Sequence, residues 1–123
     1  MNENSIKDAG VQELENASFS QLEDISLNDN NLTGAGVSSL TKFNEIRYLS
    51  LSANNLDDES IKKIKYINPK GLVYVRLSKN RFTNKALEEL MNINGLEVLM
   101  MDRNRLNKKK SEIQVPESLF LFY

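Results

Sequence analysis

The sequence predicts an α/β solenoid: four to five short parallel strands form one concave sheet, and helices cover its convex side. Three observations predict this fold. One eleven-residue frame recurs four times, Asn stands at the same place in every frame, and the segments between frames carry apolar residues at helical spacing. A chain of 123 residues is long enough for one such domain with one core.

The four frames alternate apolar and polar places in the same way. Places one and four are aliphatic, place six is aliphatic or Met, and place eleven is Leu or Phe. Places four and six are two residues apart, so in a strand both side chains point to the same face, the expected interior. The frames are LEDISLNDNNL (22–32), IRYLSLSANNL (46–56), LVYVRLSKNRF (72–82) and LEVLMMDRNRL (96–106).

Place nine is Asn30, Asn54, Asn80 or Asn104, at spacings of 24, 26 and 24 residues. The chain turns off the strand here, which leaves buried backbone N–H and C=O groups without a sheet partner. An Asn side chain carries both donors and an acceptor, and can satisfy the backbone of its own and the next coil. We therefore expect a ladder of these four structural asparagines. Ordinary surface turns also favour Asn, but they do not predict a fixed offset from the leucines.

Three helices are expected between the frames. Asp57 or Asp58 is a suitable N-cap for the second helix, and Thr83 or Asn84 for the third. A right-handed crossover makes the strands parallel and places all helices on one side of the sheet. The helical stripes are Val37, Leu40 and Phe43, then Ile61, Ile64 and Ile67, then Ala86, Leu87 and Leu90.

The two ends are interpreted as caps of one domain. NSIKDAGVQEL (4–14) matches NNLTGAGVSSL (30–40), with Asn4 at the place of Asn30, so a helix without a strand opens the chain and covers the first strand's flank. In the tail, leucines alternate with phenylalanines over residues 119–122. The assignment is one domain over 1–123, with a half-repeat cap at 1–21, four repeats at 22–112 and a strand or cap at 113–123. A piece of a longer solenoid would show the same pattern.

The residue types restrict the chemistry of the chain. Cys and His are absent, so zinc and copper sites, Cys nucleophiles and the Ser–His–Asp arrangement are excluded. The GAG at residues 34–36 is no phosphate loop, because no Lys-Ser/Thr follows it. We expect no catalytic residue, no metal and no cofactor. No apolar run reaches roughly 18–20 residues and the polar start MNENSIKDAG is unlike a signal peptide, so we also expect no membrane partner.

Charge divides the chain into two unlike halves. Residues 1–60 hold 11 acidic and 3 basic side chains, a balance of −8, and residues 61–123 hold 6 acidic and 13 basic ones, a balance of +7. The run RNRLNKKK (103–110) raises the question of nucleic-acid binding. The net charge of −1 and the acidic first half disfavour it, and such runs are usually solvated turns.

The frame L-x-x-L-x-L-x-x-N-x-L resembles that of leucine-rich-repeat proteins, and NNLTGAGVSSL is similar to their helical, ribonuclease-inhibitor-like subclass. The resemblance covers roughly residues 4–113. It implies a protein bound on the concave sheet, in some members an enzyme that is thereby blocked. Repeats of 24 to 26 residues are shorter than is typical of that subclass, and the disulfide caps of extracellular members are missing.

The composition carries a second resemblance. With 16 Asn residues and many Lys and Ile, the chain is similar to type IV-secreted effectors of intracellular bacteria such as Legionella. This resemblance implies a virulence role and a cytoplasmic location, in the cytoplasm of the host cell after delivery.

The expected binding surface is the concave face of the sheet. Places three, five, seven and eight should face solvent there, and like places should form columns about 4.8 Å apart. Tyr48 and Tyr74 then stand side by side in an outward column, where packing of the core does not require an aromatic residue. Tyr and Arg recur in binding hot spots, although cross-strand aromatic pairs can also stabilise a sheet. The predicted partner-binding residues are Asp24, Tyr48, Ser50, Tyr74, Arg76, Lys79, Val98, Met100, Asp102 and Arg103.

We therefore expect a non-enzymatic module, monomeric in isolation, that binds one protein partner through its concave face. In a sharper version, the partner is an enzyme whose active site this face covers. Two alternatives remain from other classes. The acidic start and basic end could stack head to tail into a scaffold, or the basic half could bind nucleic acid.

Overall fold

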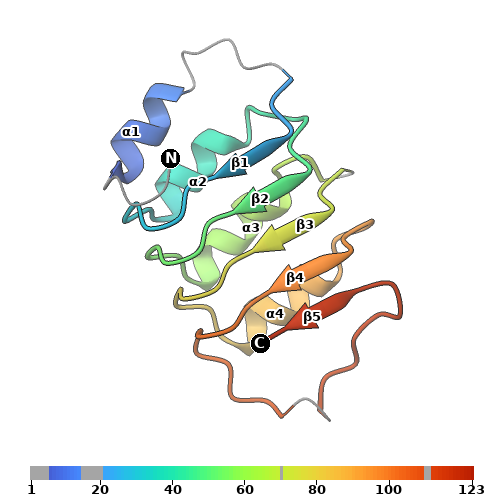
Figure 1. Ribbon diagram of the computed structural model, residues 1–123. Coiled ribbons are helices and arrows are strands. Elements are labelled where there is room, and N and C mark those ends of the chain that lie inside the picture. The colour runs from blue at the N-terminus through green and yellow to red at the C-terminus, as the bar shows by residue number, and fades with distance from the viewer. Residues whose placement is uncertain (1–5, 15–20, 70, 110–111) are drawn as a thin grey trace.

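Five parallel strands form one sheet in sequence order, and α2, α3 and α4 lie behind it (Figure 1). A computed structural model describes residues 6–14, 21–69, 71–109 and 112–123. The predicted fold class is thereby confirmed, with five strands at the upper end of the expected four to five. The elements are α1 (Lys7–Leu14), β1 (Asp24–Ser26), α2 (Gly34–Leu40), β2 (Tyr48–Ser50), the 3₁₀ turn η1 (Asp58–Ser60), α3 (Ile61–Lys65), β3 (Tyr74–Arg76), α4 (Asn84–Met91), β4 (Val98–Met100) and β5 (Phe120–Phe122).

The first four strands each occupy places three to five of a frame, which explains how the sheet buries one face only. Place four lies at the middle of each strand and points toward the helices, while places three and five point the other way. Place six follows the strand and is also buried in every frame. The buried residues of these two places are Ile25, Leu27, Leu49, Leu51, Val75, Leu77, Leu99 and Met101.

The helices bury the stripes that the sequence predicts, and they close the core from the convex side. Thr33 caps α2, its hydroxyl accepting from the Ala35 N–H. Of the two candidates for the second helix, Asp57 caps the 3₁₀ turn that leads into it: its carboxylate accepts from the Glu59 N–H, and Ser60 completes a capping box. The chain enters α3 through this 3₁₀ turn.

Carboxylates also bind across coils, from one helix start to the next. Asp8 in α1 accepts from the backbone N–H groups of Thr33 (2.8 Å) and Gly36 (3.0 Å) and from the Thr33 hydroxyl. A Cβ at position 36 would lie 2.5 Å from the Asp8 carboxylate, so this approach requires glycine. Asp58 binds the backbone and hydroxyl of Thr83 in the same manner. Thr83 caps α4 by its backbone, while its hydroxyl is used between coils.

The two ends of the solenoid are covered by different structures. The predicted half-repeat helix is present as α1 and packs on α2, whereas Asn4 lies outside the described residues. Between β4 and β5, residues 101–109 and 112–119 contain no α-helix.

The asparagines at place nine form a ladder of hydrogen bonds, with Asn30, Asn54 and Asn80 buried and Asn104 half-buried. The Asn54 carbonyl oxygen accepts from the backbone N–H groups of Asn30 (3.1 Å) and Leu32 (2.9 Å), and its amide donates to the carbonyls of Leu27 and Leu51 (both 3.0 Å). Asn80 and Asn104 accept from Leu56 and Phe82 in the same way, and Asn30 accepts from Ile6.

The ladder runs in one direction, which corrects the sequence-based expectation. Each Asn binds its own coil and the preceding one, not the next. The reason is that the unpaired N–H groups of each turn, such as that of Leu32, point toward the following coil. Their acceptor must therefore come from there.

Replacing Asn54 by Ala should lower the free energy of unfolding by about 3 kcal/mol or more, because it leaves several buried backbone groups without partners. Asn55→Ala is the matched control: this neighbour is exposed, and its replacement should change stability by less than about 0.5 kcal/mol. Urea unfolding followed by circular dichroism measures both. Equal stabilities of the two variants would contradict the role of the ladder.

Candidate protein-binding face

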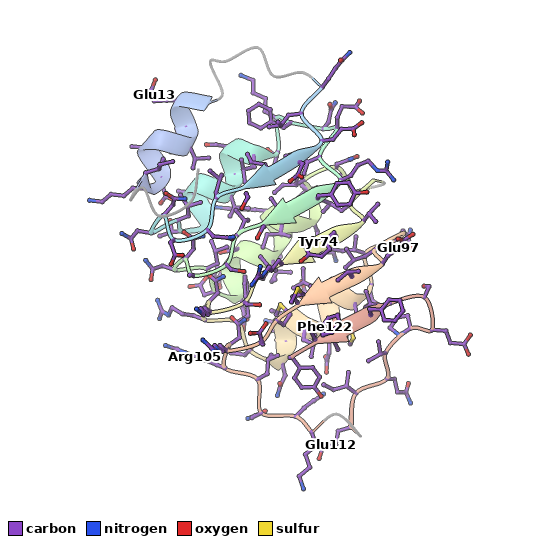
Figure 2. The ribbon with its side chains drawn as sticks, in the orientation of Figure 1. Glu13, Tyr74, Glu97, Arg105, Glu112 and Phe122 are labelled. Atoms are coloured by element: carbon purple, nitrogen blue, oxygen red, sulfur yellow. The ribbon has the colours of Figure 1, made fainter. Side chains whose placement is uncertain are left out.

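The strand register brings the outward side chains into two columns on the sheet face opposite the helices, called here the open face. Tyr48 pairs with Tyr74, and Tyr74 with Val98, so the two tyrosines are neighbours as predicted. Figure 2 shows Tyr74 and Phe122 on this face. The place-three column is Asp24, Tyr48, Tyr74, Val98 and Phe120, and the place-five column is Ser26, Ser50, Arg76, Met100 and Phe122.

The two tyrosines are held differently. The Tyr48 side chain is 41% exposed, and the Arg47 guanidinium lies 5.9 Å from its ring centroid, within cation–π range. Tyr74 is half-buried, and its hydroxyl donates to the Met100 sulfur at 3.1 Å. Between the rings lies a shallow hollow of about 200 Å³, lined by Asp24, Tyr48, Leu49, Ser50 and Tyr74. The face thus has a relief into which a partner's side chain can fit.

Two aromatic residues extend this face beyond the residues predicted from the sequence. Phe120 and Phe122 of β5 are 70% and 51% exposed, and they continue the place-three and place-five columns past Val98 and Met100. The alternation of leucine and phenylalanine in the tail was the signal: Leu119 is buried and both phenylalanines point outward. The exposed apolar surface therefore runs from Tyr48 to the last strand.

The predicted exposure of place seven is wrong for two of its four residues. Ser52 is 6% and Ser78 2% exposed, whereas Asn28 and Asp102 are half-buried. The strands end at place five, so the alternation of faces ends there too, and the chain turns inward.

The side chains of Asn28, Ser78 and Asp102 at place seven bind the neighbouring coil instead. The Asn28 side chain accepts from the Ser52 N–H (2.6 Å) and the Ser50 hydroxyl (2.9 Å). The carboxylate of Asp102 accepts from the Ser78 hydroxyl. Of the predicted site residues, Ser50 and Asp102 therefore already serve the contacts between coils.

Place eight is exposed in three of the four coils, and its backbone is unusual in all of them. Asp29, Ala53, Lys79 and Arg103 have φ values of 58°, 55°, 56° and 59°. This left-handed region is costly for residues with a Cβ, and Gly or Asn occupies it more readily. Lys79 and Arg103 nevertheless point long cationic side chains into solvent here.

Charge is distributed unevenly over the open face. Glu23, Asp24 and Asp29 lie on the coil of β1, whereas Arg76, Lys79 and Arg103 lie on the coils of β3 and β4, all of them exposed. Figure 2 shows Glu97 at the edge where β4 begins and Arg105 at the opposite edge, beyond its end. The basic residues thus gather where the last strands turn off the sheet.

Three comparisons place this geometry among known proteins. A family model described as "Leucine Rich repeat" matches residues 21–40 and 45–65. Mouse podocan is 32% identical over 93 residues, which are 74% of this chain and 14% of podocan. The crystal structure of an internalin from Listeria monocytogenes superposes with a TM-score of 0.65 at 15% identity, over 89% of this chain and 30% of the internalin chain.

The fold is a leucine-rich-repeat solenoid. The recurring frame, the matches to the family model and the asparagine ladder agree on this. The likeness to the internalin concerns the fold, and the chain spans about a seventh of podocan's length. In the described part of the chain, no cluster of three acidic residues could hold a metal ion, and no helix could span a bilayer.

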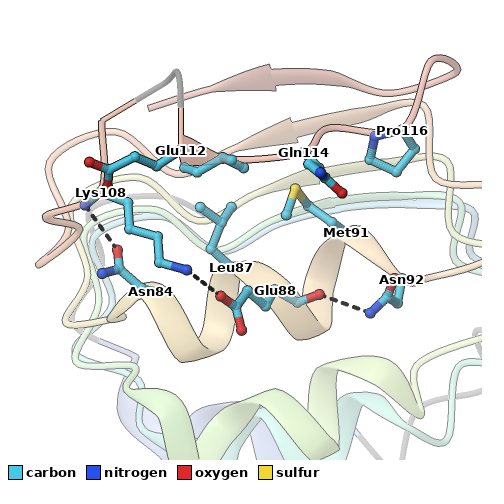
Figure 3. A pocket seen from close by; sticks show the side chains of 10 residues that line it. Asn84, Leu87, Glu88, Met91, Asn92, Lys108, Glu112, Gln114 and Pro116 are labelled. Atoms are coloured by element: carbon cyan, nitrogen blue, oxygen red, sulfur yellow. Dashed lines mark hydrogen bonds and ion pairs between the residues drawn. The ribbon is translucent and has the colours of Figure 1, made fainter.

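A second hollow of about 340 Å³ lies away from the open face, between α4 on one side and Lys108 and residues 112–116 on the other (Figure 3). Leu87, Met91 and Ile113 line it. Lys108 crosses its mouth to Glu88, Nζ to Oε1 2.6 Å, and the hydrogen bond and charge of Glu88 raise the pKa of Lys108. Part of the basic run 103–110 is therefore engaged within the protein.

Replacing Ala53 by Gly should raise the free energy of unfolding by about 0.5–1 kcal/mol, because the left-handed backbone no longer carries a Cβ. The same change at Ala35 in α2, where φ is negative, should lower it by roughly 0.5–1 kcal/mol. Thermal unfolding of the two variants tests the backbone at place eight. A loss of stability in both would show that position 53 is not in the left-handed region.

Proposed function

We propose that this leucine-rich-repeat solenoid is a non-enzymatic binding module that engages one protein partner through its open face. One observation carries the proposal: Tyr48, Tyr74, Val98 and Phe120 stand in one in-register column on the face away from the core. Aromatic side chains provide large, rigid contact area, and they are enriched where binding energy concentrates. Leucine-rich-repeat proteins typically mediate protein–protein interactions, which supports the same reading.

The size of the face limits the form of the partner. Five strands at about 4.8 Å spacing extend about 19 Å along the stack. This is enough for the centre of a standard interface, with the turns and strand starts as its rim. About six residues of extended chain would cross it. A short protruding segment of the partner therefore suits the open face best.

Two finer predictions extend this function. Covering the active site of an enzyme is consistent with a partner segment held on the open face, and the resemblance to the ribonuclease-inhibitor-like subclass supports it. Secretion by a type IV system, a role in virulence and a cytoplasmic location rest on the Asn-, Lys- and Ile-rich composition. Both stay predictions, and identification of the partner is the step that tests them.

The double replacement Tyr48→Ala/Tyr74→Ala should abolish capture of the partner, since each hot-spot tyrosine contributes on the order of 2 kcal/mol to affinity. The immobilised chain is used for affinity capture, and the retained protein is then titrated against each variant by calorimetry. The melting temperature should stay within about 5 °C of wild type, because neither ring belongs to the core.

Tyr66→Ala is the matched control for this experiment. Tyr66 is 69% exposed and follows α3, on the helical side of the sheet, so its replacement should leave binding unchanged. If the double variant binds as well as wild type, or if Tyr66→Ala weakens binding equally, the open face is not the site.

A further inference from the structure

Five cationic side chains form a strip along the edge where β3 and β4 turn off the sheet. Arg76 stands at place five, Lys79 and Arg103 at place eight, and Arg81 and Arg105 at place ten; this set is called here the cationic strip. All five are exposed. Within the described residues none of them takes part in an ion pair, the Glu88–Lys108 pair lying elsewhere. The carboxylate nearest in sequence, Asp102, is bound by the Ser78 hydroxyl.

This arrangement is locally unfavourable in two ways. Lys79 stacks above Arg103, and Arg81 above Arg105, on adjacent coils about 4.8 Å apart, and like charges directly opposite are destabilising. Lys79 and Arg103 also occupy left-handed backbone that Asn or Gly would adopt at lower cost. A chain with 16 Asn residues places none at these two positions. Local choices that lower stability are typical of functional sites.

We propose that the partner binds through an acidic, extended segment whose carboxylates lie along the cationic strip. Its apolar side chains contact the column from Tyr48 to Phe120, and one of them enters the hollow beside Tyr48 and Tyr74. This inference rests on the proposed function and adds the chemistry of the partner. Opposite charge fixes the register of the segment and accelerates its association, while the aromatic column supplies contact area.

Charge geometry disfavours a second copy of the chain as the occupant. In a two-fold dimer whose open faces overlap completely, with the axis at β3, Arg76 would face its own equivalent. β1 would then lie on β5, so Asp24 would meet Phe120 rather than the cationic strip. In this fully overlapped arrangement the acidic end of one copy does not neutralise the strip of the other.

Nucleic acid is disfavoured by the other end of the same face. Glu23, Asp24 and Asp29 are exposed on the coil of β1 and would repel a phosphate backbone that crossed the sheet. A protein segment avoids this conflict because its own charge can change sign along its length.

A random 12-residue peptide library displayed on phage, selected on the immobilised full chain, tests the inference. Retained peptides that the Tyr48→Ala/Tyr74→Ala variant does not hold should contain an excess of Asp and Glu over Lys and Arg. A synthetic copy of the most enriched peptide is then titrated by fluorescence anisotropy. Its affinity should fall as salt rises from about 0.05 to 0.5 M, since exposed charge pairs are screened.

Four double variants assign this effect to the strip. Lys79→Asn/Arg103→Asn removes two charges, is tolerated by the left-handed backbone and should weaken the peptide about tenfold. Lys62→Asn/Lys85→Asn removes two exposed charges from α3 and α4 on the helical side and should leave affinity unchanged. Lys79→Arg/Arg103→Lys keeps the charges and should retain binding. Selection on Lys79→Glu/Arg103→Glu should enrich basic peptides instead.

The outcomes separate this inference from the proposed function. Peptides that need the tyrosines but show no acidic excess, or that bind Lys79→Asn/Arg103→Asn normally, overturn the acidic segment and leave the binding face standing. If no retained peptide depends on the tyrosines, both proposals fail. Retention of a random single-stranded DNA 12-mer that Lys79→Asn/Arg103→Asn loses would assign the strip to phosphate binding instead. A dimer in sedimentation that the same variant loses would assign it to self-association.

Discussion

The backbone of every turn that leaves the sheet must find hydrogen-bond partners inside the protein, and the rest of the structure depends on how this is achieved. A strand of three residues supplies few sheet bonds, so the buried groups beyond it need side-chain partners. Asn54 supplies one acceptor to two N–H groups of the preceding coil and donors to carbonyls of both coils. Asn80 joins the second coil to the third in the same way, through the Leu56 N–H and the Leu51 carbonyl, and this offset aligns Tyr48 with Tyr74.

The parts of the fold that obey a fixed period could be predicted from the sequence. The leucines at places four and six define the buried face, and the constant place of Asn30, Asn54, Asn80 and Asn104 defines the register. Once the register is known, the columns follow by counting, which is why the neighbours Tyr48 and Tyr74 could be named in advance. The helical stripes were equally regular, as the burial of Ile61 and Ile64 shows.

The parts of the structure that depart from the regular repeat could not be predicted in the same way. Alternation of faces is a property of strands, and it fails at Ser52 and Ser78 because the strand has already ended. The left-handed backbone of Lys79 has no signature in its residue type, since that conformation normally selects Gly or Asn. Phe120 could not be assigned to the place-three column from the sequence, because the tail carries no fifth copy of the frame. Its place is known from the structure, in which β5 continues the register.

In the described part of the chain, the side-chain contacts between coils join neighbouring coils. Asp8 reaches Thr33, Asp58 reaches Thr83, and each ladder Asn reaches one coil back. The free energy of folding is then close to a sum of terms for single coils and for adjacent pairs, as in a one-dimensional chain of spins. A lesion near one end therefore frays that end alone, whereas a lesion at β3 separates two short remnants. The column from Tyr48 to Phe120 crosses this central coil, so loss of its cooperativity also breaks the alignment of the column.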